Sequence, residues 1–189
     1  MDVFEAIRWR RSVRKFSPQR IEREKIIRIL EAARLAPSSS NRQAWHFVVI
    51  DDKSLIEQIP KQVTMGTRAI IPWLKDAPVV IAGCYTKAIT HIIAQLFGHE
   101  NYLVDVSIAM SHIALAATTL GIGTCFVGWF NESKLKRLLG IPLQYKVAVL
   151  LALGYPADAS TKDSIGNVAP RSRKNLNEIV SYNRFSKRF

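Results

Sequence analysis

Two short polar clusters hold the side chains best suited to bind an anionic ligand. The first is Arg10-Arg11-Ser12-Val13-Arg14, at the end of an expected N-terminal helix. Arginine presents a planar fork of N–H donors that matches phosphate oxygens two at a time, so three arginines and a serine within five residues could cradle an anion. The alternative is a solvated charge run whose cations complement the helix dipole.

The second cluster, Ala36-Pro37-Ser38-Ser39-Ser40-Asn41-Arg42-Gln43, follows the second expected helix. Its hydroxyl and amide groups suit a polar heterocycle, and with the first cluster they favour a ligand that carries both a phosphate and such a ring. The alternative is a plain loop after the proline that ends the helix.

The composition predicts one globular domain over residues 1–189, because the chain is long enough for a full core and 48% of it is hydrophobic. Cys84 and Cys125 lie far apart, without the spacing of a metal site or a disulfide framework, and fit a reducing cytosol. The histidines have no metal-ligand spacing either. We therefore expect a cytoplasmic protein without a metal.

The net charge of +12 favours an anionic partner. Nucleic acid is the alternative, but the basic residues are spread over the chain and no nucleic-acid-binding motif is present. The basic tail, residues 171–188, also contains interleaved apolar residues. We therefore expect the tail to dock, and a small anionic ligand rather than nucleic acid.

Residues 106–130 contain no Lys, Arg, Asp or Glu and are numerous enough to span a bilayer. Polar residues and the run Leu120-Gly121-Ile122-Gly123 interrupt this segment. A core helix that is covered by other elements accounts for it better than a membrane span does.

Apolar periodicity and turn residues predict the order of helices and strands. Asp2 and Asn131 are suitable helix caps, and Pro37 ends the second helix. Helices are expected over 3–10, 22–34, 54–60, 102–120 and 132–139, and strands over 45–50, 78–84, 124–128 and 146–153. Apolar strands that alternate with helices predict an α/β or α+β sheet covered on both faces.

Four features now occur in order: the Arg-Arg-Ser-x-Arg helix end, the Pro-Ser-x-x-Asn-x-Gln turn, the Leu120-Gly121-Ile122-Gly123-Thr124 corner and the terminal Arg171-Ser172-Arg173. With the strands at Trp45–Ile50 and Ala77–Val80, this set resembles the FMN-dependent nitroreductase family over nearly the whole chain. The two glycines of the corner could also form only a helix cap and a bend.

The resemblance implies an α+β fold with a central, mixed, mainly antiparallel sheet flanked by helices. It also implies a homodimer with an intertwined C-terminal tail and two FMN sites at the subunit interface. The expected activity is the transfer of a hydride from NADH or NADPH, through FMN, to a small acceptor such as a nitroaromatic or a quinone, by a ping-pong mechanism. No catalytic side chain is named, because solvent can supply the proton.

The family pattern assigns cofactor contacts to particular residues of this chain. The basic cluster and the C-terminal pair would bind the phosphate and ribityl chain: Arg10, Arg11, Ser12, Arg14, Arg171 and Arg173. The turn would come from the other subunit and line the flavin ring: Pro37, Ser38, Ser39, Ser40, Asn41 and Gln43. The backbone at the reactive edge would be Phe126, Val127 and Gly128. Arg14 is the candidate cation near the flavin pyrimidine, where it would raise the reduction potential.

The chain also departs from the family. Positions where several members carry a ring-contacting Asn and Lys correspond to Ile70 and Trp73, with Arg68 as a candidate replacement. The acidic residue that many members have near Gly128 is absent, and the segment 86–101, where members build a substrate lid, is short. Flavin destruction with oxygen, reductive dehalogenation and a non-catalytic flavin- or nucleic-acid-binding module therefore stay as alternatives.

Overall fold

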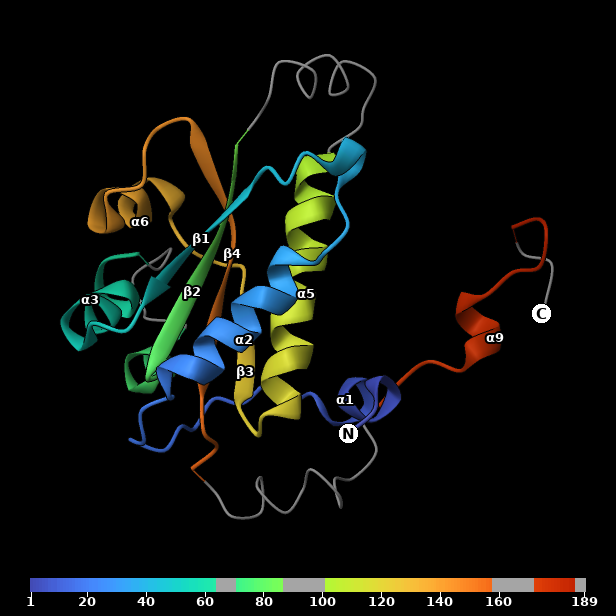
Figure 1. The fold of residues 1–189 in the computed structure, drawn as a ribbon, viewed down its shortest axis with the longest axis horizontal. Coiled ribbons are helices and arrows are strands. Elements are labelled where there is room, and N and C mark those ends of the chain that lie inside the picture. Colours follow the sequence, from blue (N-terminus) through green and yellow to red (C-terminus); the bar gives the residue numbers. More distant parts are fainter. Residues whose placement is uncertain (64–70, 87–100, 158–171, 186–189) are drawn as a thin grey trace.

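The centre of the fold is a four-stranded sheet, seen in a computed structural model that describes residues 1–63, 71–86, 101–157 and 172–185 (Figure 1). Its strands are β1 (Trp45–Ile50), β2 (Val79–Thr86), β3 (Gly123–Val127) and β4 (Tyr145–Gly154), in the order β1-β2-β4-β3. All three pairings are antiparallel. Among the described residues, parallel pairing is limited to one isolated bridge, which joins Ser12 to Thr124 of β3.

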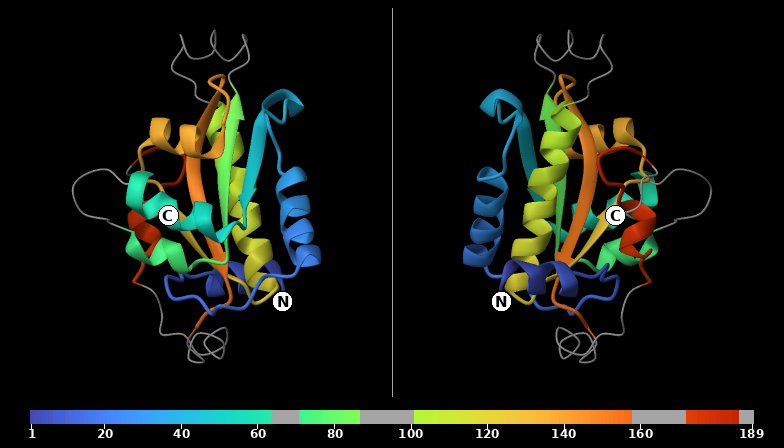
Figure 2. Two further views of the ribbon diagram at one scale, coloured as in Figure 1. Left: turned by 90° about the vertical axis from the view of Figure 1, so that its left-hand side faces the viewer. Right: turned by 90° about the vertical axis from the view of Figure 1, so that its right-hand side faces the viewer.

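Helices cover both faces of this sheet, as the sequence predicted (Figures 1 and 2). On one face lie α2 (Arg23–Arg34) and α5 (Asn101–Thr119). On the other lie α3 (Lys53–Gln58), the π-helical turn η2 (Ile59–Val63), the 3-10 turn η3 (Pro72–Asp76) and α6 (Glu132–Leu139). A separate apolar cluster fills each interface, which explains why the first six residues of β2 are all buried.

The long apolar segment forms the core helix α5. Within the described residues α5 is the one helix long and apolar enough to cross a membrane. Its buried side chains, among them Val106, Met110 and Ile113, pack into the cluster between the sheet and α2. The packing confirms the prediction of a covered core helix.

The helix ends follow local capping rules. At α1 (Val3–Trp9), the Asp2 carboxylate accepts from the Glu5 N–H and the Glu5 carboxylate accepts from the Asp2 N–H, each at 2.8 Å, which is a capping box. At the end of α5, Gly121 has φ +73°, and the Ile122 N–H donates to the Ala117 carbonyl at 2.9 Å. This is the Schellman termination that glycine favours, so Gly121 is a helix cap, the simpler of its two interpretations.

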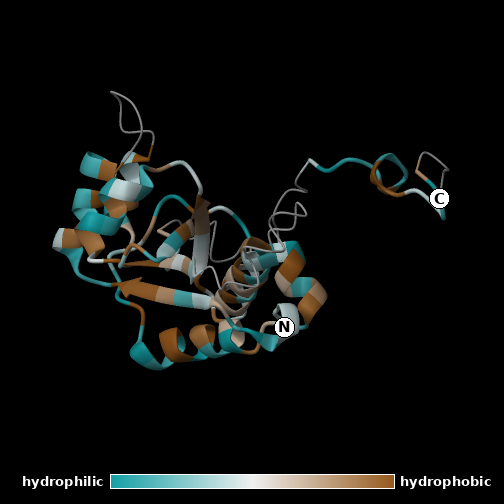
Figure 3. Ribbon diagram, turned by 90° about the horizontal axis from the view of Figure 1, so that it is seen from above, coloured by the Kyte–Doolittle hydropathy of each residue, from teal (hydrophilic) through white to brown (hydrophobic). Residues whose placement is uncertain are grey.

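From α9 onward, the C-terminal tail stands apart from the body of its own chain (Figures 1 and 3). It contains the short helix α9 (Leu176–Ile179), which the sequence analysis did not predict. Leu176, Ile179 and Tyr182 are each more than half exposed, and Phe185 is 97% exposed. Within a single chain, these four side chains therefore remain largely uncovered.

A polar network joins the start of α2 to the end of β4. The buried Tyr155 hydroxyl donates to the Glu22 carboxylate and accepts from the Lys25 ammonium at 2.6 Å, and Lys25 lies 3.1 Å from Glu22. The hydrogen bond from Tyr155 is the main cause that lowers the pKa of Glu22 to about 2. The network therefore stabilises the ionised form of Glu22.

We expect this network to make folding stability fall at acid pH. The pKa of Glu22 in the folded chain is below its ordinary value of 4.5. As the pH falls, the Glu22 carboxylate is therefore protonated in the unfolded chain before it is protonated in the folded chain. The contribution is present above pH 4.5 and is lost as the pH falls towards 2. The melting temperature of Glu22→Gln should accordingly fall less than that of the wild type over this range. Glu24→Gln, which removes the same charge from the same helix, is the control and should follow the wild type.

Candidate functional site

The basic segment after α1 is fixed to the edge strand β3. The Val13 N–H donates to the Thr124 carbonyl at 2.9 Å, beside the Ser12–Thr124 bridge. A Cβ on Gly123 would lie 2.6 Å from the Val13 side chain, so a side chain at this position would push the segment away. Gly123 therefore permits the close approach that positions the predicted anion cradle.

Cations from both ends of the chain converge on this segment. Burial lowers the pKa of Arg10, and the positive charges of Arg173 and then of Arg11 lower it further. The tail thus brings Arg173 to the N-terminal cluster, whereas Arg171 lies outside the described residues. Repulsion among these three cations favours an anion between them.

Arg14 and Ser12 lie on the Cys125 side of the same cluster. Burial raises the pKa of the Cys125 thiol, and the charge of Arg14, a hydrogen bond with Ser12 and the charge of Arg10 oppose this shift. Arg14 is five residues beyond the last helical residue, Trp9, too far to complement the helix dipole. The helix-end interpretation therefore does not account for Arg14.

Trp73, one of the departures from the family pattern, supports Arg14. The guanidinium carbon of Arg14 lies 5.9 Å from the centre of the Trp73 ring, a cation–π contact, and Trp73 lies 6.4 Å from the Phe16 ring. Ile70 and Arg68 lie outside the described residues.

The edge of β3 next to the cradle is partly open. Phe126 is 41% exposed, Val127 is buried, and a Cβ on Gly128 would meet nothing within 4 Å. The Thr124 hydroxyl is buried and has no hydrogen-bond partner among the described residues. A buried hydroxyl without a partner is costly, so this edge offers both space and an available polar group.

The second predicted cluster forms a strained turn around the 3-10 turn η1 (Ser39–Asn41). Ser40, Asn41 and Gln43 have φ of +52°, +52° and +50°. Such angles cost a non-glycine residue roughly 1 kcal/mol or more each, although Asn tolerates them better than most residues. The Gln43 N–H donates to the Ser38 hydroxyl at 3.0 Å, and the Gln43 amide donates to the Asn41 side chain at 3.2 Å. Strain of this kind is concentrated at functional sites.

A buried carboxylate anchors this turn, and the sequence analysis missed it. The Ser39 N–H donates to both oxygens of Asp105, at 3.1 and 3.2 Å, and Asp105 is only 5% exposed. Asp105 is the one charged residue within the apolar helix α5, a signal that was present in the sequence. Its partner, Ser39, is 66 positions away and could not be inferred from spacing.

Within one chain the two clusters lie at opposite ends of α5 (Figure 1). The strained turn contacts Asp105 near the start of the helix, and the cradle adjoins β3, which follows its end at Thr119. Asp105 and Thr119 are 14 residues apart, about 21 Å at the helical rise per residue. The structure therefore brings the members of each cluster together but does not bring the two clusters together.

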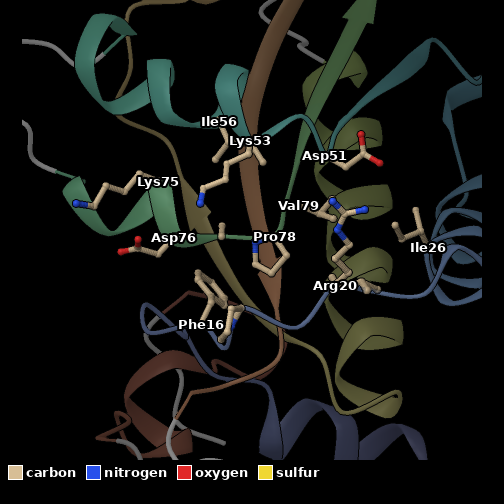
Figure 4. A pocket seen from close by; sticks show the side chains of 13 residues that line it. Phe16, Arg20, Ile26, Asp51, Lys53, Ile56, Lys75, Asp76, Pro78 and Val79 are labelled. Carbon is tan, nitrogen blue, oxygen red and sulfur yellow. The ribbon is translucent and has the colours of Figure 1, made fainter.

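A pocket of about 550 Å³ lies between α2, α3 and η3 (Figure 4). Phe16 and Ile56 contribute to its apolar wall, and charged side chains including Arg20, Lys53 and Asp76 surround it. None of the predicted cofactor contacts lines it. Phe16, which lines the pocket, packs against Trp73, the residue that contacts Arg14.

The chain belongs to the nitroreductase family, whose model matches residues 7–155. The fold agrees: a nitroreductase family protein from Clostridium novyi NT is 31% identical, with a TM-score of 0.76 over 100% of this chain and 97% of that one. An FMN-dependent nitroreductase from Clostridium difficile R20291 is 27% identical, with a TM-score of 0.76 over 96% and 99%.

A protein of Methanothermobacter thermautotrophicus, named "Putative NADH dehydrogenase/NAD(P)H nitroreductase", is 35% identical over 162 residues. The alignment covers 84% of this chain and 79% of that relative. The family resemblance inferred from the motifs is thereby confirmed, together with the expected α+β architecture.

Proposed function

We propose that this chain is an FMN-dependent oxidoreductase that takes a hydride from NADH or NADPH and reduces small acceptors such as nitroaromatics or quinones. Family membership and the names of the relatives support a flavin oxidoreductase. The observation that carries the assignment is the convergence of Arg10, Arg11 and Arg173 on a segment fixed to β3. A phosphate with nearly two negative charges requires several cations at once.

The residues present fit FMN. The cradle would hold the phosphate with Arg10, Arg11, Ser12 and Arg173. The Thr124 hydroxyl, for which the described part of the chain offers no hydrogen-bond partner, lies beside it. Arg14, held over Trp73, would supply a positive charge near the pyrimidine part of the ring. FMN, when bound, supplies the hydride and electron chemistry, while the protein supplies position and electrostatics.

The protein would act as a homodimer. The strained turn and the cradle are separated along α5, so a second chain is needed to bring a turn to each cradle. The uncovered apolar side chains of the tail, with Phe4 on α1 at 77% exposure, fit a partner that buries them. Two sites, each formed by both chains, follow from such an arrangement. We also propose that the protein is cytoplasmic, because its two cysteines, Cys84 and Cys125, lack the spacing of a disulfide framework and fit a reducing compartment.

The test is reduction by nicotinamide followed by turnover with acceptors. The purified protein should be yellow, lose colour under NADH or NADPH without oxygen, and regain it when menadione or a nitroaromatic is added. Because donor and acceptor would use one flavin face in turn, double-reciprocal plots at several acceptor concentrations should be parallel.

Intersecting lines, or no NAD(P)H oxidation with any quinone while FMN is bound, would overturn the proposed reaction. Loss of the flavin itself under oxygen, or dehalogenation of an aryl halide without quinone reduction, would instead favour the alternative reactions.

A further inference from the structure

We propose that Asp105 is a positioning residue that fixes the strained turn 38–43 in the conformation that contacts the flavin ring, and that it acts on the site of the partner subunit. The inference rests on the proposed function and adds to it a residue that the family motifs did not indicate. Asp105 does not touch the cofactor in this proposal; it acts through the backbone of Ser39.

Burying the Asp105 carboxylate is costly. The Asp105 residue is only 5% exposed, so the charge of its carboxylate must be compensated by hydrogen bonds or an opposite charge. Among the described residues, the hydrogen-bond donor to this carboxylate is the Ser39 N–H. An apolar side chain would fill this position on a core helix at less cost. Core packing therefore does not explain why a carboxylate occupies this position.

The conformation of the turn 38–43 requires support from outside the turn. Three of its six residues have left-handed backbone angles, a conformation that persists only where its surroundings hold it. Internal bonds brace it from Ser38 to Gln43, but they do not attach it to the body of the protein. The two contacts with Asp105 supply that attachment, at the point where η1 lies beside the start of α5 (Figure 1).

The interaction between the Asp105 carboxylate and η1 is electrostatic. A carboxylate that accepts the first N–H of η1 fixes the direction in which the following residues, Ser40 and Asn41, are presented. Both are exposed in the single chain, as is expected of residues that face a ligand held by another subunit. Loss of the anchor should let the turn relax and weaken only the contacts that it makes with the ring.

The experiment compares the binding of FMN and of riboflavin, which lacks the phosphate, to the apoprotein. Asp105→Ala should raise both dissociation constants by about 10-fold or more and leave their ratio unchanged, because the phosphate contacts are intact. The visible absorption band of the bound flavin should also shift. Asp105→Asn retains an acceptor oxygen for the Ser39 N–H and should restore most of the affinity.

The matched control is Thr118→Val, which removes another buried polar group of α5 whose hydroxyl donates to Ala114 within the helix. If Asp105→Ala does not fold, Ser39→Pro removes the same hydrogen bond, at a first helical position where proline is tolerated. A merely structural role predicts that Thr118→Val and Asp105→Ala lower the melting temperature and change flavin binding alike.

Mixed dimers test the action across the interface. A dimer of one Asp105→Ala chain with one Arg10→Ala/Arg14→Ala chain should contain one unimpaired site and bind one FMN with wild-type affinity. If Asp105 acted within its own chain, both sites would be impaired. Unchanged affinities in Asp105→Ala would overturn the inference alone, whereas a wild-type chain that binds no FMN would overturn the proposed function and the inference with it.

Discussion

Replacing Arg10 and Arg14 together with alanine is expected to release FMN from the protein during purification. A hydrogen bond to a charged group contributes about 1.5–3 kcal/mol. Loss of two such contacts should weaken binding by about 3 kcal/mol or more, at least about 100-fold in the dissociation constant. Arg10 lies among the other cations of the cradle, and the Arg14 guanidinium lies over the Trp73 ring. Flavin absorbance per chain and titration of the apoprotein measure the loss.

Two comparison variants separate charge from geometry. Arg20→Ala/Arg23→Ala removes the same two charges from exposed positions outside the cradle and should keep its flavin. Arg10→Lys/Arg14→Lys keeps the charges but loses the planar fork, and should bind FMN with intermediate affinity. A double alanine variant that stays fully yellow with unchanged affinity would show that the phosphate lies elsewhere.

The local elements of the fold could be predicted because their causes are local. The β-branched and aromatic run at 45–50 defined β1 at its observed bounds, and the predicted α6 was confirmed together with its Asn131 cap. By contrast, the neighbour order β1-β2-β4-β3 depends on which apolar faces meet, and no local pattern contains it. The short turns η2 and η3 were missed for another reason: each has only five residues, too few to show a repeating apolar pattern.

In the candidate site, too, features that depend on residue type could be predicted, and contacts between distant residues could not. The cradle could be proposed from the sequence because the guanidinium group of arginine binds anions wherever it lies. The structure places Arg173 near Arg10, and the binding of a phosphate there stays a prediction. The role of Gly123 could not be predicted, since it depends on the approach of Val13 from more than a hundred residues away. Neither could the support of Arg14 by Trp73 or the anchoring of the turn by Asp105, because those contacts exist only once the chain has folded.

The second large effect is expected from substitutions in the C-terminal tail, which should change the oligomeric state. Leu176 and Ile179 lie three residues apart on α9, so they share a face, and both are more than 60% exposed in the single chain. Burial of such a side chain contributes about 1.5–3 kcal/mol. In the proposed dimer with twofold symmetry each tail would pack on the other chain, so every substitution would remove that contribution twice.

Ile179→Asp should therefore dissociate the dimer, because two apolar contacts, together about 3–6 kcal/mol, are lost and two carboxylates would have to be buried. Light scattering at micromolar concentration measures the mass. Flavin should be lost with the dimer, since each cradle then lacks the turn of its partner. Asn177→Asp adds the same charge to the polar face of α9 and should remain dimeric and yellow. A wild-type chain that is monomeric at micromolar concentration and still holds FMN would contradict the dimeric site.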